Sequence, residues 1–99
     1  MAITKQYLKS KPVCKVTFSI LAEDAEKVSV VGSFNEWDAE ATPLKKLKNG
    51  IFKTTLDLDT DSSYEFKYLI DETVYANDDA ADAYVWSDFA SADNSVVNV

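Results

Sequence analysis

Apolar and polar residues alternate along much of the chain with the period of two that is typical of half-buried β-strands. The alternation is clearest over 14–20, 52–59 and 64–71, and shorter valine-rich runs cover 28–31 and 94–99. Turn residues separate these segments, and helical periodicity is weak everywhere. The pattern therefore predicts an all-β fold, namely an antiparallel β-sandwich.

The segments outside the predicted strands are interpreted as an arm, turns and loops. Residues 1–11 are predicted to form a loose N-terminal arm, and 12–99 a single sandwich domain, since 99 residues have room for one core. A loop is expected over 34–42. Residues 77–93 are mostly Asp, Ala and Ser with interspersed aromatics, so they are expected to form a long loop with at most one helical turn near 78–83.

The aromatic residues fall into two groups. Those at or near inward strand positions are predicted to build the core, together with Cys14 as a small buried residue; they are Phe18, Phe52, Tyr64, Phe66 and Tyr68. The others lie among Asn, Asp, Ser and Glu; they are Trp37, Tyr75, Trp86 and Phe89. A Trp in a polar loop either plugs the end of a sandwich or offers its flat face to a ligand, and the pattern leaves both readings open.

The charge of the chain excludes several classes of partner. There are 10 lysines, no arginine and 17 acidic residues, for a net charge of −7. Such a chain repels phosphate groups, so nucleic acids and anionic membranes are poor partners. No apolar run approaches the roughly 18 residues of a membrane span, and the first residues lack the apolar stretch of a signal peptide. The single cysteine cannot form an internal disulfide, so the expected compartment is a reducing cytoplasm.

Three aspartates have part of the spacing of a calcium-binding loop. Asp57, Asp59 and Asp61 match the first three ligands of an EF-hand, but the sixth and twelfth positions, which require Gly and Glu, hold Ser62 and Tyr68. Strand alternation followed by a turn explains these residues more simply, so no metal site is expected.

Nothing in the sequence indicates catalysis. The chain contains no histidine, which excludes Ser-His and Cys-His pairs and leaves Cys14 without an activating base. The carboxylates of Asp78, Asp79 and Asp82 could suggest a glycosidase, but a solvated loop in which Asp side chains cap turns is the simpler interpretation. We therefore expect neither an enzyme nor a bound cofactor.

The segment from Val30 to Asp38, with the sequence VVGSFNEWD, resembles the Gly-x-Phe-Asn-x-Trp signature of family 48 carbohydrate-binding modules. This family includes the isoamylase N-terminal, or early set, domains and the glycogen-binding domain of the β subunit of AMP-activated protein kinase. The likeness covers roughly residues 12–99 and continues in order through Thr42-Pro43-Leu44, Gly50-Ile51-Phe52, Leu56-Asp57-Leu58, the strand from Tyr64 to Asp71, Asn77-Asp78 and the strand from Asn94 to Val97.

The resemblance implies an immunoglobulin-like β-sandwich that binds α-1,4-linked glucans, such as glycogen, starch and maltodextrins, without catalysis. In glycogen-binding members two Trp residues stack on glucose rings, a Lys and an Asn hydrogen-bond hydroxyls, and an apolar side chain passes beside the glucan. The implied carbohydrate-binding residues of this chain are Trp37, Tyr75 in place of the second Trp, Lys67, Asn94 and Phe89.

Some positions depart from the pattern of the family. Tyr75 gives a smaller platform than Trp, and Glu72 and Ala90 stand where Gly is usual. Trp86 is an additional aromatic, which either supplements the glucan platform or packs under the long loop.

The resemblance leaves two functions open. The expected one is binding of an α-glucan; the alternative is a protein-interaction or regulatory module of the same fold that docks on a glycan-metabolising enzyme. Because the sequence ends with the last predicted strand, the chain is expected to be the module alone, similar to small stand-alone bacterial members of the family.

Overall fold

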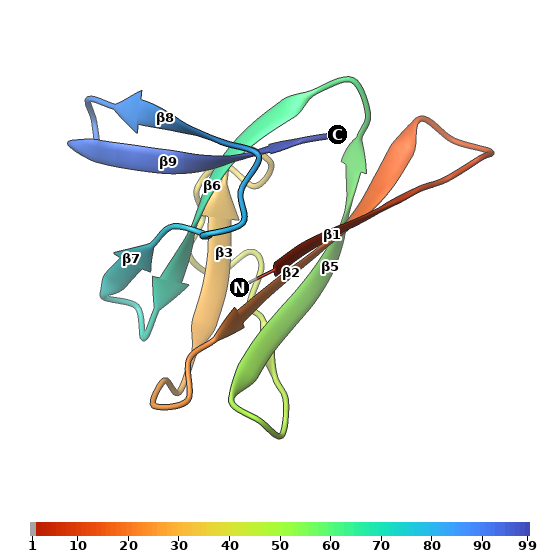
Figure 1. Cartoon of the computed structure of the whole chain (residues 1–99). Coiled ribbons are helices and arrows are strands. Elements are labelled where there is room, and N and C mark those ends of the chain that lie inside the picture. The colour runs from red at the N-terminus through yellow and green to blue at the C-terminus, as the bar shows by residue number, and fades with distance from the viewer. Residues whose placement is uncertain (1) are drawn as a thin grey trace.

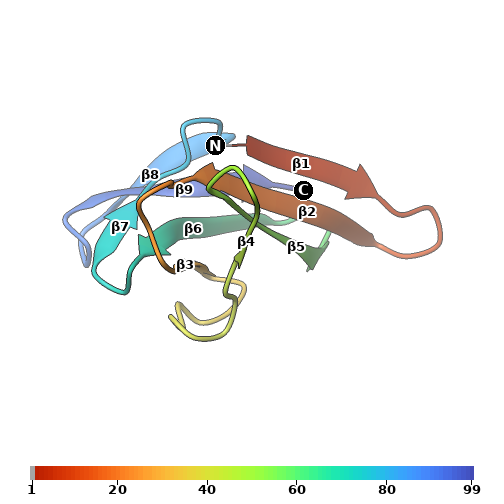
Figure 2. The ribbon, with the colours of Figure 1, turned by 90° about the horizontal axis from the view of Figure 1, so that it is seen from below.

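Two antiparallel β-sheets lie face to face in the computed structural model, which describes residues 2–99 (Figure 1). One sheet has the order β1-β2-β5-β4, and the other has the order β3-β6-β9-β8 with β7 paired to β6; Figure 2 shows the two layers from below. The strands are β1 (Ala2–Tyr7), β2 (Val13–Leu21), β3 (Val28–Gly32), β4 (Lys45–Lys46), β5 (Ile51–Asp59), β6 (Ser63–Ile70), β7 (Val74–Ala76), β8 (Ala83–Ser87) and β9 (Ala92–Asn98). The predicted all-β antiparallel sandwich is therefore confirmed, and residues 2–99 contain no helix that could cross a membrane.

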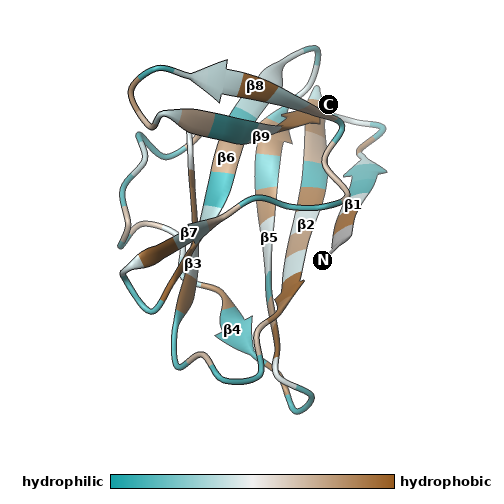
Figure 3. Cartoon of the chain, turned by 60° about the vertical axis from the view of Figure 1, so that its left-hand side comes forward, coloured by the Kyte–Doolittle hydropathy of each residue, from teal (hydrophilic) through white to brown (hydrophobic). Residues whose placement is uncertain are grey.

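The core forms where the alternating strands of the two sheets face each other. Figure 3 shows the alternation of hydropathy along β2 and β5. The predicted core residues are buried, with the exception of Tyr64, which is half-buried and packs against the core. The ring of Phe18 in β2 meets that of Phe66 in β6 edge-on, with centroids 5.0 Å apart. This aromatic contact joins the two sheets and adds to the hydrophobic stabilisation of the core.

The first described residues form an edge strand and are not the loose arm that we expected. In β1, Ile3 pairs with Phe18 and Lys5 pairs with Val16, so both β1 side chains are directed toward the opposite sheet. The ammonium group of Lys5 lies 2.7 Å from the carboxylate of Asp82. An inward lysine interrupts the apolar alternation, which hid this strand from the sequence analysis, and it protects the edge from pairing with other chains.

The segment 77–93 is also more regular than predicted. It contains β8, which pairs with β9, while β7 precedes it and pairs with β6. Two aromatics that we placed in loops, Tyr75 and Trp86, therefore lie on strands. The prediction was wrong because β8 is an edge strand whose Tyr84, Val85 and Trp86 are all exposed, so its sequence has no alternation to detect.

A buried carboxylate holds the chain between β7 and β8 against the second sheet. Asp78 is fully buried; its Oδ2 accepts a hydrogen bond from the Tyr68 hydroxyl at 2.6 Å, and its Oδ1 accepts one from the backbone N–H of Ala80 at 2.7 Å. The backbone N–H of Asp78 donates to Oγ of Ser95 at 2.9 Å. Burial, together with the hydrogen bond and charge of Asp78, raises the pKa of Tyr68, so the tyrosine remains a donor. This network fixes the connection onto the central strands β6 and β9.

Candidate functional site

The turn after β3 is shaped by a glycine that lies directly against β6. A Cβ atom at Gly32 would stand 2.5 Å from the carbonyl oxygen of Glu65 and 2.9 Å from Cβ of Phe66, so this approach requires glycine. Two residues later, the ring of Phe34 packs toward the core, with its centroid 5.8 Å from that of Phe18. The start of the turn is thus tied to both sheets.

The side-chain amide of Asn35 closes the same turn. Its Oδ1 accepts a hydrogen bond from the backbone N–H of Gly32 at 3.0 Å, while its Nδ2 donates to the carbonyl oxygen of Val30 at 3.0 Å and to Oγ1 of Thr42 at 2.9 Å. The backbone N–H of Trp37 donates to the carbonyl oxygen of Gly32 at 2.9 Å. The Gly-x-Phe-Asn-x-Trp sequence is therefore one structural unit, and it holds Trp37 in a fixed place at the surface.

Trp37 has a backbone conformation that bulky residues rarely adopt. Its φ angle is 58°, in the left-handed region, where a residue other than glycine is strained by an energy on the order of 1–3 kcal/mol. The residue is nevertheless 41% exposed, so burial of the indole does not account for the conformation. A large aromatic residue kept exposed on a strained backbone is a feature that accompanies functional sites.

Lys67 and Asn94 supply polar groups from the middle of the second sheet. Lys67 lies between the core residues of β6 and opposite Val31 in β3, so its side chain is directed away from the core. Lys67 is only 8% exposed, yet nothing in residues 2–99 forms a hydrogen bond or ion pair with its ammonium group. Asn94 of β9 is 6% exposed, and its Nδ2 donates to Oε1 of Glu65 at 3.2 Å. The lysine thus offers its donors to a ligand.

These side chains line one open hollow of about 960 Å³ together with two further aromatics. Tyr75 of β7 and Phe89, from the loop between β8 and β9, are both largely exposed to solvent. All five residues that the sequence singled out therefore surround the same hollow, although they come from five separate segments of the chain. The lining residues are Val31, Trp37, Glu65, Lys67, Tyr75, Ser87, Phe89, Ala90, Ala92 and Asn94.

Glu65 also lines this hollow, although it was not among the residues predicted from the sequence. A signal for it was present, because Glu65 and Lys67 are two residues apart on one strand and therefore share a face of the sheet. The small residues Ser87, Ala90 and Ala92 also line the hollow, but small side chains carry no chemical signature that a sequence pattern could reveal.

Trp86 lies outside the hollow. In the pairing of β8 with β9, Ser87 is opposite Ala92 and both line the hollow, whereas Trp86 is opposite Asp93 on the other face of the strand. The indole Nε1 of Trp86 donates to Oδ1 of Asp88 at 2.8 Å, and the residue is 61% exposed. Neither expectation for Trp86 fits this placement, since it neither joins the platform nor packs beneath the loop.

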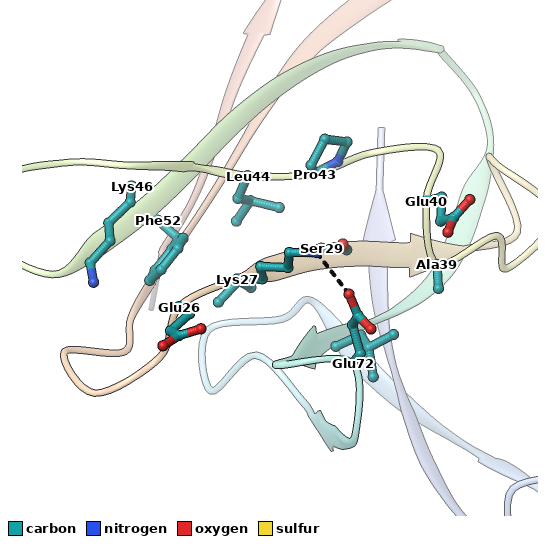
Figure 4. A pocket seen from close by; sticks show the side chains of 12 residues that line it. Glu26, Lys27, Ser29, Ala39, Glu40, Pro43, Leu44, Lys46, Phe52 and Glu72 are labelled. Carbon is teal, nitrogen blue, oxygen red and sulfur yellow. Dashed lines mark hydrogen bonds and ion pairs between the residues drawn. The ribbon is translucent and has the colours of Figure 1, made fainter.

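A second hollow, of about 590 Å³, lies beside β3 and the chain that leads into β4 (Figure 4). Its two lysines already have partners: Nζ of Lys27 is 2.9 Å from Oε1 of Glu72, and Nζ of Lys46 donates to the carbonyl oxygen of Ala25 at 3.0 Å. None of the five residues singled out by the sequence lines it. We therefore take the hollow around Trp37 as the candidate site.

Comparison with known proteins gives a match that includes part of this site. A family model described as carbohydrate-binding module 48 (isoamylase N-terminal domain) matches residues 6–87, which include Trp37, Lys67 and Tyr75 but not Phe89 or Asn94. Among curated relatives, the 1,4-alpha-glucan branching enzyme GlgB of Photobacterium profundum is 34% identical over 58 residues, or 58% of this chain and 8% of that enzyme. The GlgB enzymes of Aquifex aeolicus and Nitrosospira multiformis are 38% and 40% identical over 62% and 56% of this chain. The chain thus spans about a tenth or less of the length of these relatives.

Proposed function

The chain belongs to the carbohydrate-binding module 48 family, and on this basis we propose that it binds an α-1,4-linked glucan, such as glycogen, starch or a maltodextrin, in the hollow around Trp37. The observation that carries the proposal is the convergence of aromatic faces and polar groups from five segments on one hollow. The family is one of binding modules without catalytic activity, and the role proposed here is accordingly binding alone.

Exposed aromatic rings favour a sugar as the ligand. The C–H face of a pyranose is apolar and stacks on a flat ring, which removes apolar area of both partners from water. Trp37, Tyr75 and Phe89 are 41%, 60% and 102% exposed, so their rings remain accessible. The strained backbone of Trp37 and the hydrogen bonds of Asn35 fix the first ring before a ligand arrives, which lowers the entropy cost of binding.

The polar groups of the hollow match the hydroxyls of a glucan. A hydroxyl both donates and accepts hydrogen bonds, so a sugar requires both kinds of partner. The Lys67 ammonium provides donors without a partner in residues 2–99, and the carboxamide of Asn94 provides an acceptor oxygen. Because Lys67 is only 8% exposed, its hydrogen bonds to a ligand form in a partly desolvated place, where they are stronger than in water.

The relatives support an α-glucan over other polysaccharides. Three of them are named as 1,4-alpha-glucan branching enzymes, and the part of each that matches this chain is a small fraction of its length. We extend to this chain the glucan class in their name but not their reaction. A cytoplasmic location, where bacterial glycogen is stored, accords with this ligand and forms part of the proposal.

Electrophoresis through native gels with and without glycogen tests the proposal. Binding retards the protein in the glycogen gel relative to an unrelated acidic protein of similar size. A parallel gel with dextran, whose glucose units are α-1,6-linked, controls for polysaccharide viscosity. We expect retardation by glycogen and little by dextran, and no change between roughly 50 and 500 mM salt in a solution assay, because a neutral ligand releases no counterions.

Unchanged mobility at high glycogen would contradict glucan binding. In that case the docking of this module on a glycan-metabolising enzyme would become the better account. Equal retardation by dextran would contradict the assignment to α-1,4-linked glucans.

A further inference from the structure

Glu65 lines the hollow and is hydrogen-bonded to two neighbouring segments. Its backbone N–H donates to Oγ of Ser33 at 3.2 Å, and its carbonyl oxygen accepts from the backbone N–H of Ser33 at 2.9 Å. The side-chain Oε1 accepts from Nδ2 of Asn94 at 3.2 Å. The backbone of Glu65 is therefore tied to the turn that holds Trp37, and its carboxylate is bound to the strand that carries Asn94.

The bond from Asn94 sets the direction of its amide. With Nδ2 turned to Glu65, the amide oxygen of Asn94 is on the other side of the carboxamide and has no hydrogen-bond donor within residues 2–99. Asn94 thus presents an acceptor, and Lys67 presents donors. If Glu65 were absent, the amide could rotate and this complementarity would be lost.

Glu65 also determines the charge of the hollow. Among the lining residues, only Lys67 and Glu65 carry formal charges, so the hollow is neutral although the whole chain has a charge of −7. The two residues are neighbours on one face of β6, with Cα atoms roughly 7 Å apart at the usual rise of a strand. They do not form a direct ion pair in the described part of the chain, which leaves space for ligand hydroxyls between them.

We propose that Glu65 is a specificity-determining residue of the hollow. Its carboxylate orients the amide of Asn94 toward the ligand. It also balances the charge of Lys67, so that the hollow accepts uncharged glucans and rejects glucans that carry phosphate or other anionic groups. This inference rests on the proposed function, because it concerns the ligand class of the same hollow. A lysine alone would attract an anionic sugar, and a carboxylate at this distance repels one.

The test compares two ligands on the full chain by isothermal titration calorimetry: maltoheptaose, and a maltoheptaose that carries phosphate monoesters. We expect the unmodified chain to bind the phosphorylated ligand at least about fivefold more weakly at low salt. Glu65→Gln keeps an oxygen that can accept from Asn94 but removes the negative charge, so the ratio of its affinity for the phosphorylated ligand to its affinity for maltoheptaose should rise about tenfold. High salt should reduce this rise. Glu65→Ala should weaken maltoheptaose binding about fivefold or more, as the amide of Asn94 is released.

Asp57→Asn is the matched control. It changes the net charge by the same amount, but Asp57 lies on β5, in the sheet that does not carry the hollow. There it forms an ion pair with Lys15 of the neighbouring strand β2. We expect it to leave the preference between the two ligands unchanged. Circular dichroism and thermal unfolding confirm that each variant is folded.

The outcomes separate the inference from the proposed function. If the chain binds maltoheptaose and Glu65→Gln leaves the preference unchanged, or shifts it no more than Asp57→Asn does, the role of Glu65 is wrong while glucan binding stands. If the unmodified chain binds no maltoheptaose at all, the proposed function fails and the role of Glu65 fails with it.

Discussion

Replacement of Trp37 by alanine should separate glucan binding from folding. The indole is the aromatic face that the turn after β3 holds in the hollow, and an aromatic anchor of a binding surface contributes about 2 kcal/mol or more. At about 1.4 kcal/mol for each tenfold, this predicts a loss of affinity of about 30-fold or more for maltoheptaose. The affinity is measured by isothermal titration calorimetry.

The cost of the same substitution to the fold should be small. A fully buried Trp truncated to Ala costs about 3–5 kcal/mol, but Trp37 is 41% exposed and lies in a turn that other residues fix. We therefore expect a loss of about 1–2 kcal/mol in urea unfolding. Trp37→Gly should be at least as stable as Trp37→Ala, because glycine adopts a φ of 58° without strain.

Trp86→Ala provides the matched control. Trp86 is also exposed, at 61%, but it lies on the face of β8 away from the hollow, so its loss should leave the affinity within about twofold. The reasoning fails if Trp37→Ala binds maltoheptaose as tightly as the unmodified chain, or if it unfolds the protein. Either result would mean that Trp37 supports the fold and is not a platform for the ligand.

Further predictions concern side-chain hydrogen bonds that hold the turns and connections of the fold. Asn35→Ala removes three hydrogen bonds from the turn, and should cost about 2–3 kcal/mol in urea unfolding and weaken glucan binding as well; an unchanged unfolding midpoint would contradict this. Tyr68→Phe leaves the buried carboxylate of Asp78 without its 2.6 Å donor, and should cost about 1.5–3 kcal/mol in the same assay, whereas a neutral result would argue against the network. Hydrogen bonds from the backbone N–H groups of Lys27 and Glu26 hold the pKa of Asp71 below its usual value. The ionised Asp71 therefore stabilises the folded state fully above about pH 4, and this contribution is lost as the pH falls through the lowered pKa of the folded state. Asp71→Asn should therefore make the unfolding midpoint less sensitive to acid, and an identical pH profile would refute this.

Strands that alternate were predictable from the sequence, and strands at the edges were not. In β2 the residues from Cys14 to Ile20 face the core and solvent in turn, so the pattern records the fold directly. In β8 both faces are exposed, and in β1 an inward Lys5 replaces an apolar residue; in neither strand do apolar and polar residues alternate along the sequence. An edge strand forms because its backbone hydrogen-bonds to the adjacent strand. Its own sequence therefore need not show the alternation that would predict it.

The candidate site was predictable as far as its residues carry a distinct chemistry. Trp37, Lys67 and Asn94 could be named because they stand at positions that bind sugar in the family that the sequence resembles. That they meet in one hollow depends on the register of β3, β6 and β9, which no single segment encodes. Glu65 was overlooked because an acidic residue on an exposed strand face of an acidic chain usually serves only for solvation.

The most direct test of glucan binding in this hollow is a titration of the isotope-labelled chain with maltoheptaose, followed by two-dimensional nitrogen–proton NMR. The account predicts progressive shifts of the Trp37 indole N–H and the Asn94 side-chain amide, with the indole N–H of Trp86 unmoved as an internal reference. Shifts confined to residues around Lys27 and Glu72 in the second hollow, or no shifts at millimolar ligand, would contradict it.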